Sequence, residues 1–446
     1  MERIPANIRV KTENFRAIDK ADIIIDGITV VAGENGCGKS SLSKLLYFLY
    51  KTVSNYELVV KENLISNLSD VIKFLDIVQQ ELRVGIKDRS VRDEFRRELY
   101  GLRRNLMISE FLEDELNNWD ALVVRIEDAY NESNINESNL KESNKFRHNN
   151  VRLNYIIKDI LKNDHDENID NLNPFSKIKN IIASKFEDAI SKIKTRPTSL
   201  FIEELKSVFP DGELPKKFEV LEFDDLIVAL SNDYLSIPYS IQNAIYIDTP
   251  MMISVKDSHN IWWDDLNELL LEKNVNVNNK ITQIISKEIT QGDILNEEGI
   301  YSTDDFKFKR SDGIIFNLLD VATGIKSFSI LQMLLKNGSI TDKTLLICDE
   351  PESNLHPQWI IEYARIIVML NKELGVKFFI ASHNPDMVSA IRYISEKEGT
   401  LNGVNFYLAE KSKEKFKYNF KFLGKEIDPI FESFNIAIDR INLYGI

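Results

Sequence analysis

Three short segments of the sequence contain residues whose types and spacing suit phosphate chemistry, and the first is a glycine-rich loop. Gly33–Ser40 reads Gly-Glu-Asn-Gly-Cys-Gly-Lys-Ser, which matches the P-loop spacing GxxxxGK(S/T). Glycines let backbone N–H groups turn toward phosphates, and a helix that begins near Lys39 adds a favourable dipole. We expect Lys39 to neutralise the β- and γ-phosphates of ATP and the Ser40 hydroxyl to ligate Mg²⁺. The predicted ATP-binding residues are Gly33, Glu34, Asn35, Gly36, Cys37, Gly38, Lys39, Ser40 and Ser41.

The sequence around this loop favours a P-loop over a glycine-rich turn that matches the spacing by chance. Ile28–Ala32 is a run suited to a buried strand, and leucines at helical spacing follow the loop from Leu42 to Leu49. A strand, a loop and then a helix is the context in which the motif holds phosphates.

The second segment is an apolar run that ends in two carboxylates. Leu345–Cys348 precedes Asp349 and Glu350. We expect Asp349 to hold Mg²⁺ through water and Glu350 to act as the general base on an attacking water. Any strand can lead into an acidic loop, so this pattern becomes specific only together with the upstream P-loop. P-loop kinases and GTPases commonly lack the second carboxylate here, and the pair therefore favours an ATPase that hydrolyses.

These residues resemble a known superfamily. The segment from Asp349 to Pro357, DEPESNLHP, is similar to the "DEPE-x-x-LHP" segment of ABC-type ATPases related to SMC and OLD proteins, and Asn14-Phe15-Arg16 is similar to their "NFR" first strand. The resemblance implies ATP and Mg²⁺ as cofactors. It also implies a head-to-tail homodimer, or a higher even oligomer, in which the P-loop of one copy and the signature motif of the other hold each ATP.

The third segment and the signature motif are assigned through the same resemblance. Ser382-His383-Asn384-Pro385 follows the apolar run Phe378–Ala381 and is similar to the switch histidine segment, so His383 would contact the γ-phosphate and sense hydrolysis; a purely structural histidine is the alternative. Ala322–Ser327 resembles "SSGEK", with Thr323 and Gly324 as the residues that would face a partner's ATP. Ile325 replaces the usual glutamate, and a plain helix cap at Thr323 is the alternative. No Q-loop glutamine is assigned.

The strands and helices expected around these segments indicate an α/β fold. We expect an ABC-type P-loop ATPase head with a mostly helical insertion. Strand-like runs surround the motifs, whereas helical periodicity dominates from about residue 55. The predicted domains are residues 1–54 with the P-loop, 55–241 as the helical insertion, and 242–446 with the other motifs. Two strands, at 404–408 and 418–423, and a helix at 429–443 are expected after His383.

Composition narrows the functional classes. The chain has 446 residues and a formal net charge of −14, which argues against indiscriminate nucleic-acid binding because phosphate contacts need Lys and Arg. Its two cysteines, Cys37 and Cys348, exclude a disulfide framework and fit a reducing cytoplasm. No signal peptide or membrane span is expected. The basic stretch from Arg83 to Arg104 could bind nucleic acid, but its interleaved acidic residues favour a solvated, salt-bridged helix.

The sequence therefore predicts ATP binding and hydrolysis between two copies of the chain. A head with a short helical insert and no recognised nuclease constellation resembles the ATPase subunits of bacterial anti-phage systems, nearest to the PtuA family of Septu ATPases. That resemblance implies a separate nuclease subunit as partner, of HNH type in a Septu-like system. Two alternatives stay open: an SMC-like ATPase of DNA repair or chromosome association, and a scaffold that uses ATP as an assembly ligand.

Overall fold

The computed structural model describes residues 7–85, 89–138, 174–209, 213–250, 253, 260–272, 280–295, 306–432 and 443–444, and of residues 79–85, 89–96 and 132–138 it describes the backbone alone. The chain divides into two compact units. Unit 1 comprises Met1–Asn55 and Pro197–Ile446, and unit 2 is Tyr56–Arg196. The predicted α/β fold class with a helical insertion is confirmed, since unit 1 is built on a large sheet and the described elements of unit 2 are helices.

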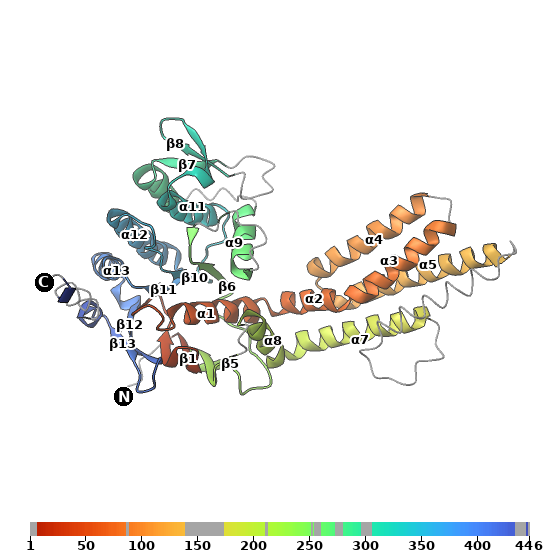
Figure 1. Cartoon of the computed structure of the whole chain (residues 1–446), viewed down its shortest axis with the longest axis horizontal. Helices are drawn as coiled ribbons and strands as arrows, with labels where there is room; N and C mark the ends of the chain where they lie inside the picture. The colour runs from red at the N-terminus through yellow and green to blue at the C-terminus, as the bar shows by residue number, and fades with distance from the viewer. Residues whose placement is uncertain are drawn as a thin grey trace. The chain divides into compact units, whose positions relative to one another are not determined.

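Unit 1 is organised around a ten-stranded sheet in the order β5-β4-β1-β2-β13-β12-β3-β11-β10-β6 (Figure 1). Its strands are β1 (Ile8–Phe15), β2 (Ile18–Ile24), β3 (Ile28–Ala32), β4 (Lys217–Glu222), β5 (Asp225–Ala229), β6 (Asn243–Ile247), β10 (Thr344–Asp349), β11 (Lys377–Ser382), β12 (Val404–Lys411) and β13 (Tyr418–Gly424). Strands β6, β10, β11, β3 and β12 run parallel, and the strands beyond them include the antiparallel pairs of β1 with β2 and β4.

The parallel strands are buried on both faces, as their continuous apolar runs predict. On one face lie α11 (Thr323–Lys336), α12 (Pro357–Leu374) and α13 (Pro385–Lys397) (Figure 1). Their apolar residues form one core with sheet side chains such as Val30 and Leu346. Helix α1 (Lys39–Ser54) contacts β6, β10 and β11. The helix that follows the P-loop is therefore fixed against the strands that carry the other motifs.

Smaller elements complete unit 1. A three-stranded antiparallel sheet contains β7 (Gly292–Leu295), β8 (Lys307–Arg310) and β9 (Ile315–Asn317). Further helices of unit 1 are α8 (Thr198–Val208), α9 (Ile261–Leu271), α10 (Lys280–Ile284), the π-helix η3 (Ile285–Ile289), and the 3₁₀ turns η5 (Leu318–Asp320) and η6 (Leu401–Gly403). The strands predicted at 404–408 and 418–423 are β12 and β13. Most of the predicted helix at 429–443 lies outside the described residues.

Unit 2 is a helical bundle with its own apolar core. Its helices are α2 (Tyr56–Asn67), α3 (Ser69–Gly85), α4 (Arg89–Ile108), α5 (Leu112–Ser138) and α7 (Pro174–Thr195). Trp119 is fully buried and lies near the ring of Phe186, which joins α5 to α7. Of the basic stretch predicted as a solvated helix or a nucleic-acid contact, Arg103 and Arg104 are exposed on α4, and the side chains from Arg83 to Arg96 lie outside the described residues.

The predicted end of the insertion near residue 241 is wrong. Unit 2 ends at Arg196, and the residues after it return to unit 1. The physical reason is strand pairing, because β4 pairs with β1 along its whole length and β5 extends the sheet beyond β4. Among the described residues, none of the helices has the length and apolarity to cross a bilayer.

Candidate nucleotide-binding site

The glycine-rich loop connects β3 to α1, as predicted. Gly38 is the N-cap of α1 with φ of 97°, and Gly36 has φ of 79°; both lie in the left-handed region that favours glycine. Gly33 is needed for another reason, because a Cβ atom there would come within 2.8 Å of the Ala409 side chain. The three glycines of the sequence Gly-x-x-Gly-x-Gly thus allow a tight loop that ends at the N-terminus of helix α1.

Lys39 is folded back onto the loop. Its Nζ atom donates hydrogen bonds to the carbonyl oxygens of Gly33 and Glu34, at 2.9 and 3.0 Å, and its residue is 5% exposed. Buried ammonium groups need such acceptors. The two carbonyls hold the Lys39 charge at the floor of the loop, where an incoming anion could replace them.

The three motif-bearing strands deliver their residues to one edge of the sheet. In the parallel register Ala32 pairs with Ser382, and Ala381 pairs with Asp349. The residues that follow these strand ends are Gly33, His383 and Glu350. Since the carboxyl ends of parallel strands share an edge, the P-loop, the acidic pair and the histidine lie at the same edge of the sheet.

Asp349 is a buried carboxylate with one satisfied and one unsatisfied oxygen. Its Oδ2 atom accepts a hydrogen bond of 2.9 Å from the Tyr246 hydroxyl. Burial raises the pKa of Asp349, which hydrogen bonds from Ser40 and Tyr246 partly oppose. Its Oδ1 atom is buried and has no hydrogen-bond partner among the described residues. An unpartnered carboxylate oxygen beside the Ser40 hydroxyl fits the oxygen ligands and bound waters of Mg²⁺.

Glu350 begins a tight turn and points its carboxylate at the histidine. Its backbone adopts φ of 53°, and its N–H donates to the Ala381 carbonyl at 2.8 Å. Its Oε1 atom lies 3.2 Å from Nδ1 of His383. The two side chains are 38% and 43% exposed, so neither is enclosed in the core.

Glu352 is a further buried carboxylate of the site, to which the sequence motifs assigned no role. Its Oε1 atom accepts hydrogen bonds from the Ser382 hydroxyl, at 2.7 Å, and from the His383 N–H, at 3.0 Å. Burial raises its pKa, and these hydrogen bonds act in the opposite direction. Tyr246 was also missed, because its contact with Asp349 arises from the pairing of β6 with β10.

A cleft of about 400 Å³ lies over the P-loop. It is lined by Arg16, Ala17, Asn35, Gly36, Gly38, Lys39, Ser40, Ser41, Glu213 and Glu350. The sequence motifs predicted the P-loop residues and Glu350. They gave Ala17 and Glu213 no role, and Arg16 was noted only for its similarity to a first-strand motif. The Arg16 guanidinium also stacks 5.1 Å from the centre of the Phe209 ring.

Thr323 and Gly324 lie elsewhere in unit 1. Helix α11 begins at Thr323, and its N-cap is Ala322, so Thr323 is not a side-chain cap. Gly324 packs so tightly on α12 that a Cβ atom would meet the Trp359 ring at 2.4 Å. Neither residue lines the cleft over the P-loop of its own chain.

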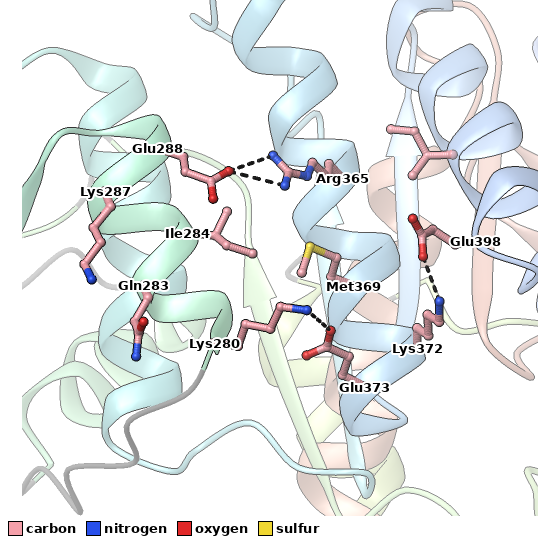
Figure 2. Close-up of a pocket in the computed structure, with 11 residues that line it drawn as sticks. Lys280, Gln283, Ile284, Lys287, Glu288, Arg365, Met369, Lys372, Glu373 and Glu398 are labelled. Carbon is pink, nitrogen blue, oxygen red and sulfur yellow. Dashed lines mark hydrogen bonds and ion pairs between the residues drawn. The ribbon is translucent and has the colours of Figure 1, made fainter.

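A second cavity, of about 460 Å³, lies between α10, η3, α12 and α13 (Figure 2). Three ion pairs span neighbouring helices there, at 3.8, 3.3 and 2.7 Å: Lys280–Glu373, Arg365–Glu288 and Lys372–Glu398. Ile284, Met369 and Ile394 add apolar surface. These ion pairs link the helices around the cavity, and none of the predicted site residues lines it.

Comparison with known proteins identifies one family and several structures. The family model described as "AAA domain, putative AbiEii toxin, Type IV TA system" matches residues 28–389. No curated protein matches the sequence.

Three SMC head structures are similar to this chain. The Smc head of Pyrococcus furiosus with an extended coiled coil, bound to the C-terminal domain of ScpA, is 10% identical over 97% of this chain and 98% of that one, with a TM-score of 0.34. The Smc head with a coiled coil and joint from Pyrococcus yayanosii is 11% identical over 96% and 99%, with a TM-score of 0.35. An SmcHead bound to the C-winged helix domain of ScpA is 10% identical over 94% and 98%, with a TM-score of 0.37.

Proposed function

Because this chain belongs to the AAA-domain family whose model spans residues 28–389, we propose that it binds ATP with Mg²⁺ at the P-loop cleft and hydrolyses it. One observation carries the proposal. Lys39 and Ser40 belong to the P-loop and Glu350 to a segment far along the sequence, yet all three line the same cleft. A phosphate-binding cation, a metal-binding hydroxyl and a carboxylate base are the groups that phosphoryl transfer to water needs.

We assign each step of the reaction to residues in or beside the cleft. The helix N-terminus at α1 attracts the phosphates, and Lys39 exchanges its two carbonyl acceptors for phosphate oxygens. Glu350 accepts a proton from water as the water oxygen attacks the γ-phosphorus and the bond to the β-phosphate oxygen breaks, which yields ADP and phosphate. Mg²⁺, when held by Ser40 and through water by Asp349, neutralises the charge on the phosphates.

Phosphate release from ATP tests this function. The wild-type chain is expected to release phosphate in the presence of Mg²⁺, and Glu350→Gln should lower the rate by about 100-fold or more, since it keeps the shape and removes the base. Glu396→Gln, on the surface of α13, is the matched control and should retain wild-type turnover. Turnover of Glu350→Gln at the wild-type rate would remove Glu350 from its role, and no phosphate release by the wild type would favour an ATP-dependent scaffold instead.

We further propose that ATP is held between two copies of the chain. Thr323 and Gly324 stand at the N-terminus of a 14-residue helix, where a helix dipole favours phosphate, but they do not line their own cleft. A second copy placed head to tail would bring them to the γ-phosphate. His383, beside Glu350, would then report hydrolysis to the rest of the head.

We propose that this ATPase regulates a separate effector nuclease in anti-phage defence. The resemblance of an ATPase head with a short helical insertion to the ATPase subunits of such systems supports this role. The purified chain with Mg²⁺ or Mn²⁺ should leave DNA and RNA intact, whereas a complex with the product of a neighbouring gene should cut them in a nucleotide-dependent way. Cleavage by the chain alone that a single substitution in it abolishes would contradict the proposal.

An SMC-like role on DNA is the second candidate, and exposed Arg103 and Arg104 on α4 favour it. Duplex DNA should then stimulate phosphate release, and the stimulation should fall in Arg103→Ala/Arg104→Ala and with added salt. Equal turnover with and without DNA would exclude this role.

A further inference from the structure

Glu352 joins the turn after β10 to the loop after β11. Its Oε1 atom accepts two hydrogen bonds from the second loop, one from the Ser382 hydroxyl and one from the His383 N–H. The same oxygen lies 3.6 Å from Nδ1 of His383. The side chain of Glu352 is 3% exposed, so water does not compete for these contacts.

The rest of the loop after β11 is anchored on either side of His383. Ser382 is fully buried, and its hydroxyl accepts a hydrogen bond of 3.1 Å from the Asn384 N–H. The Asn384 side chain caps α13 by accepting from the N–H groups of Asp386 and Met387. Glu352 therefore accepts the backbone hydrogen bond of His383, the residue of this loop whose side chain is directed at Glu350.

A buried glutamate with paired backbone contacts is not in itself a sign of function, and unit 1 contains a second example. Glu222, on β4, is 1% exposed, and its Oε2 atom accepts from the N–H groups of Tyr239 and Ser240. In both glutamates the other carboxylate oxygen is buried and has no hydrogen-bond partner in the part of the chain that the structure describes. The two glutamates differ in the segments whose N–H groups they bind. Glu222 binds the loop that contains Tyr239 and Ser240, near the end of the sheet where β4 lies, whereas Glu352 binds the backbone of His383 at the edge of the cleft.

We propose that Glu352 is a positioning residue for ATP hydrolysis, which holds His383 against Glu350 through the hydrogen bonds it accepts from Ser382 and from the His383 backbone. The proposal rests on the hydrolytic function proposed above. Glu352 is not among the residues that line the cleft, so it acts through His383 and not on the nucleotide.

Three substitutions separate position from charge. Glu352→Ala removes the acceptor, and turnover should fall by about 10- to 100-fold, no further than in His383→Ala, while ATP affinity is kept, because misplacement of a group by about 1 Å can have that effect. Glu352→Asp keeps the charge but withdraws the carboxylate by one methylene, and it should lose turnover as Ala does. Glu352→Gln keeps the acceptor oxygen without the charge, and it should retain most of the wild-type turnover.

Two further measurements complete the experiment. In a His383→Ala background, Glu352→Ala should cause no additional loss, since residues that act as a unit are not additive. Glu222→Ala is the matched control, because it removes an equally buried acceptor and should leave turnover unchanged. Hydrogen exchange at the His383 amide, followed by mass spectrometry, should accelerate in Glu352→Ala and Glu352→Asp but not in Glu352→Gln or Glu222→Ala.

This experiment distinguishes a failure of the positioning role of Glu352 from a failure of the proposed ATPase function. If the wild type does not release phosphate, hydrolysis is wrong, and exchange at the His383 amide still decides whether Glu352 holds the loop. Unchanged exchange and turnover in Glu352→Ala would overturn the positioning role. So would an equal loss in the wild-type and His383→Ala backgrounds, or a Glu352→Gln variant as slow as Glu352→Ala.

Discussion

The Nδ1 atom of His383 lies 3.2 Å from the Oε1 atom of Glu350, although the two residues follow different strands. The contact places the proposed switch beside the proposed general base, at the rim of the P-loop cleft. His383→Ala should therefore slow phosphate release by about 10- to 100-fold, because the base loses the group that orients it. ATP affinity should change little, since His383 does not line the cleft. Steady-state turnover and equilibrium ATP binding, measured on the same variant, separate the two effects.

Lys39 provides the most direct test of nucleotide binding. Lys39→Ala removes the cation that offsets the triphosphate, and ATP affinity should fall by about 100-fold or more, as loss of a charge-assisted contact in a desolvated site predicts. Lys44→Ala, on the same helix, is the control, because the Lys44 ammonium lies over the Trp262 ring. Unchanged ATP binding by Lys39→Ala in calorimetry would exclude the P-loop cleft as the site.

Gly324 and Gly101 both lie in helices, and substitution by alanine should change the stability of the fold in opposite directions at the two positions. At Gly324 a Cβ atom would meet the Trp359 ring at 2.4 Å, so Gly324→Ala should destabilise the chain by about 1–3 kcal/mol through overpacking. At Gly101 on α4 the Cβ atom meets nothing within 4 Å, and Gly101→Ala should stabilise unit 2 by about 0.5–1 kcal/mol. Thermal unfolding of both variants checks the pair. A stabilising Gly324→Ala would show that α11 does not pack on Trp359 in solution.

Asp26 gives a pH dependence with a defined sign. Burial raises its pKa above 3.8, although its Oδ1 atom accepts from the N–H groups of Asn7 and Ile8. The folded state therefore binds more protons than the unfolded state between the two pKa values, and stability falls as the pH rises through this window. Asp26→Asn keeps the acceptor and should raise the unfolding midpoint by about 2 °C at pH 7.5. The gain should shrink as the pH approaches 4.

Asp312 is the control of opposite sign. The Arg310 guanidinium lowers the pKa of Asp312, so its carboxylate stabilises the fold above the unfolded pKa. Asp312→Asn should therefore not raise the unfolding midpoint at pH 7.5. A gain with Asp312→Asn equal to that with Asp26→Asn would indicate an effect of net charge and not of burial.

The sequence was sufficient to predict the parts of the site that are encoded locally. The P-loop, the acidic pair and His383 each follow an apolar run, and parallel strands bring the ends of such runs to one edge of a sheet.

The parts that were missed depend on pairings between distant segments. Glu352 was visible in the sequence, but its hydrogen bond with Ser382 exists only because β10 lies beside β11. The end of the helical insertion was misplaced because β4 and β5 are short, and their place in unit 1 is fixed by pairing with β1 at the start of the chain. No local pattern in residues 217–229 specifies that partner.

The measurement that tests the central claim most directly is particle mass by mass photometry in the presence of ATP and Mg²⁺. Glu350→Gln should bind ATP without hydrolysing it and form particles of twice the monomer mass, which the nucleotide-free protein should not form. Adding Thr323→Asp should abolish them, because this residue stands at the start of α11, where a carboxylate suits the helix but repels a partner's γ-phosphate. The account would be contradicted if Glu350→Gln stayed monomeric with ATP. It would also be contradicted if Glu350→Gln dimerised to the same extent when ATP was left out and when Thr323→Asp was added.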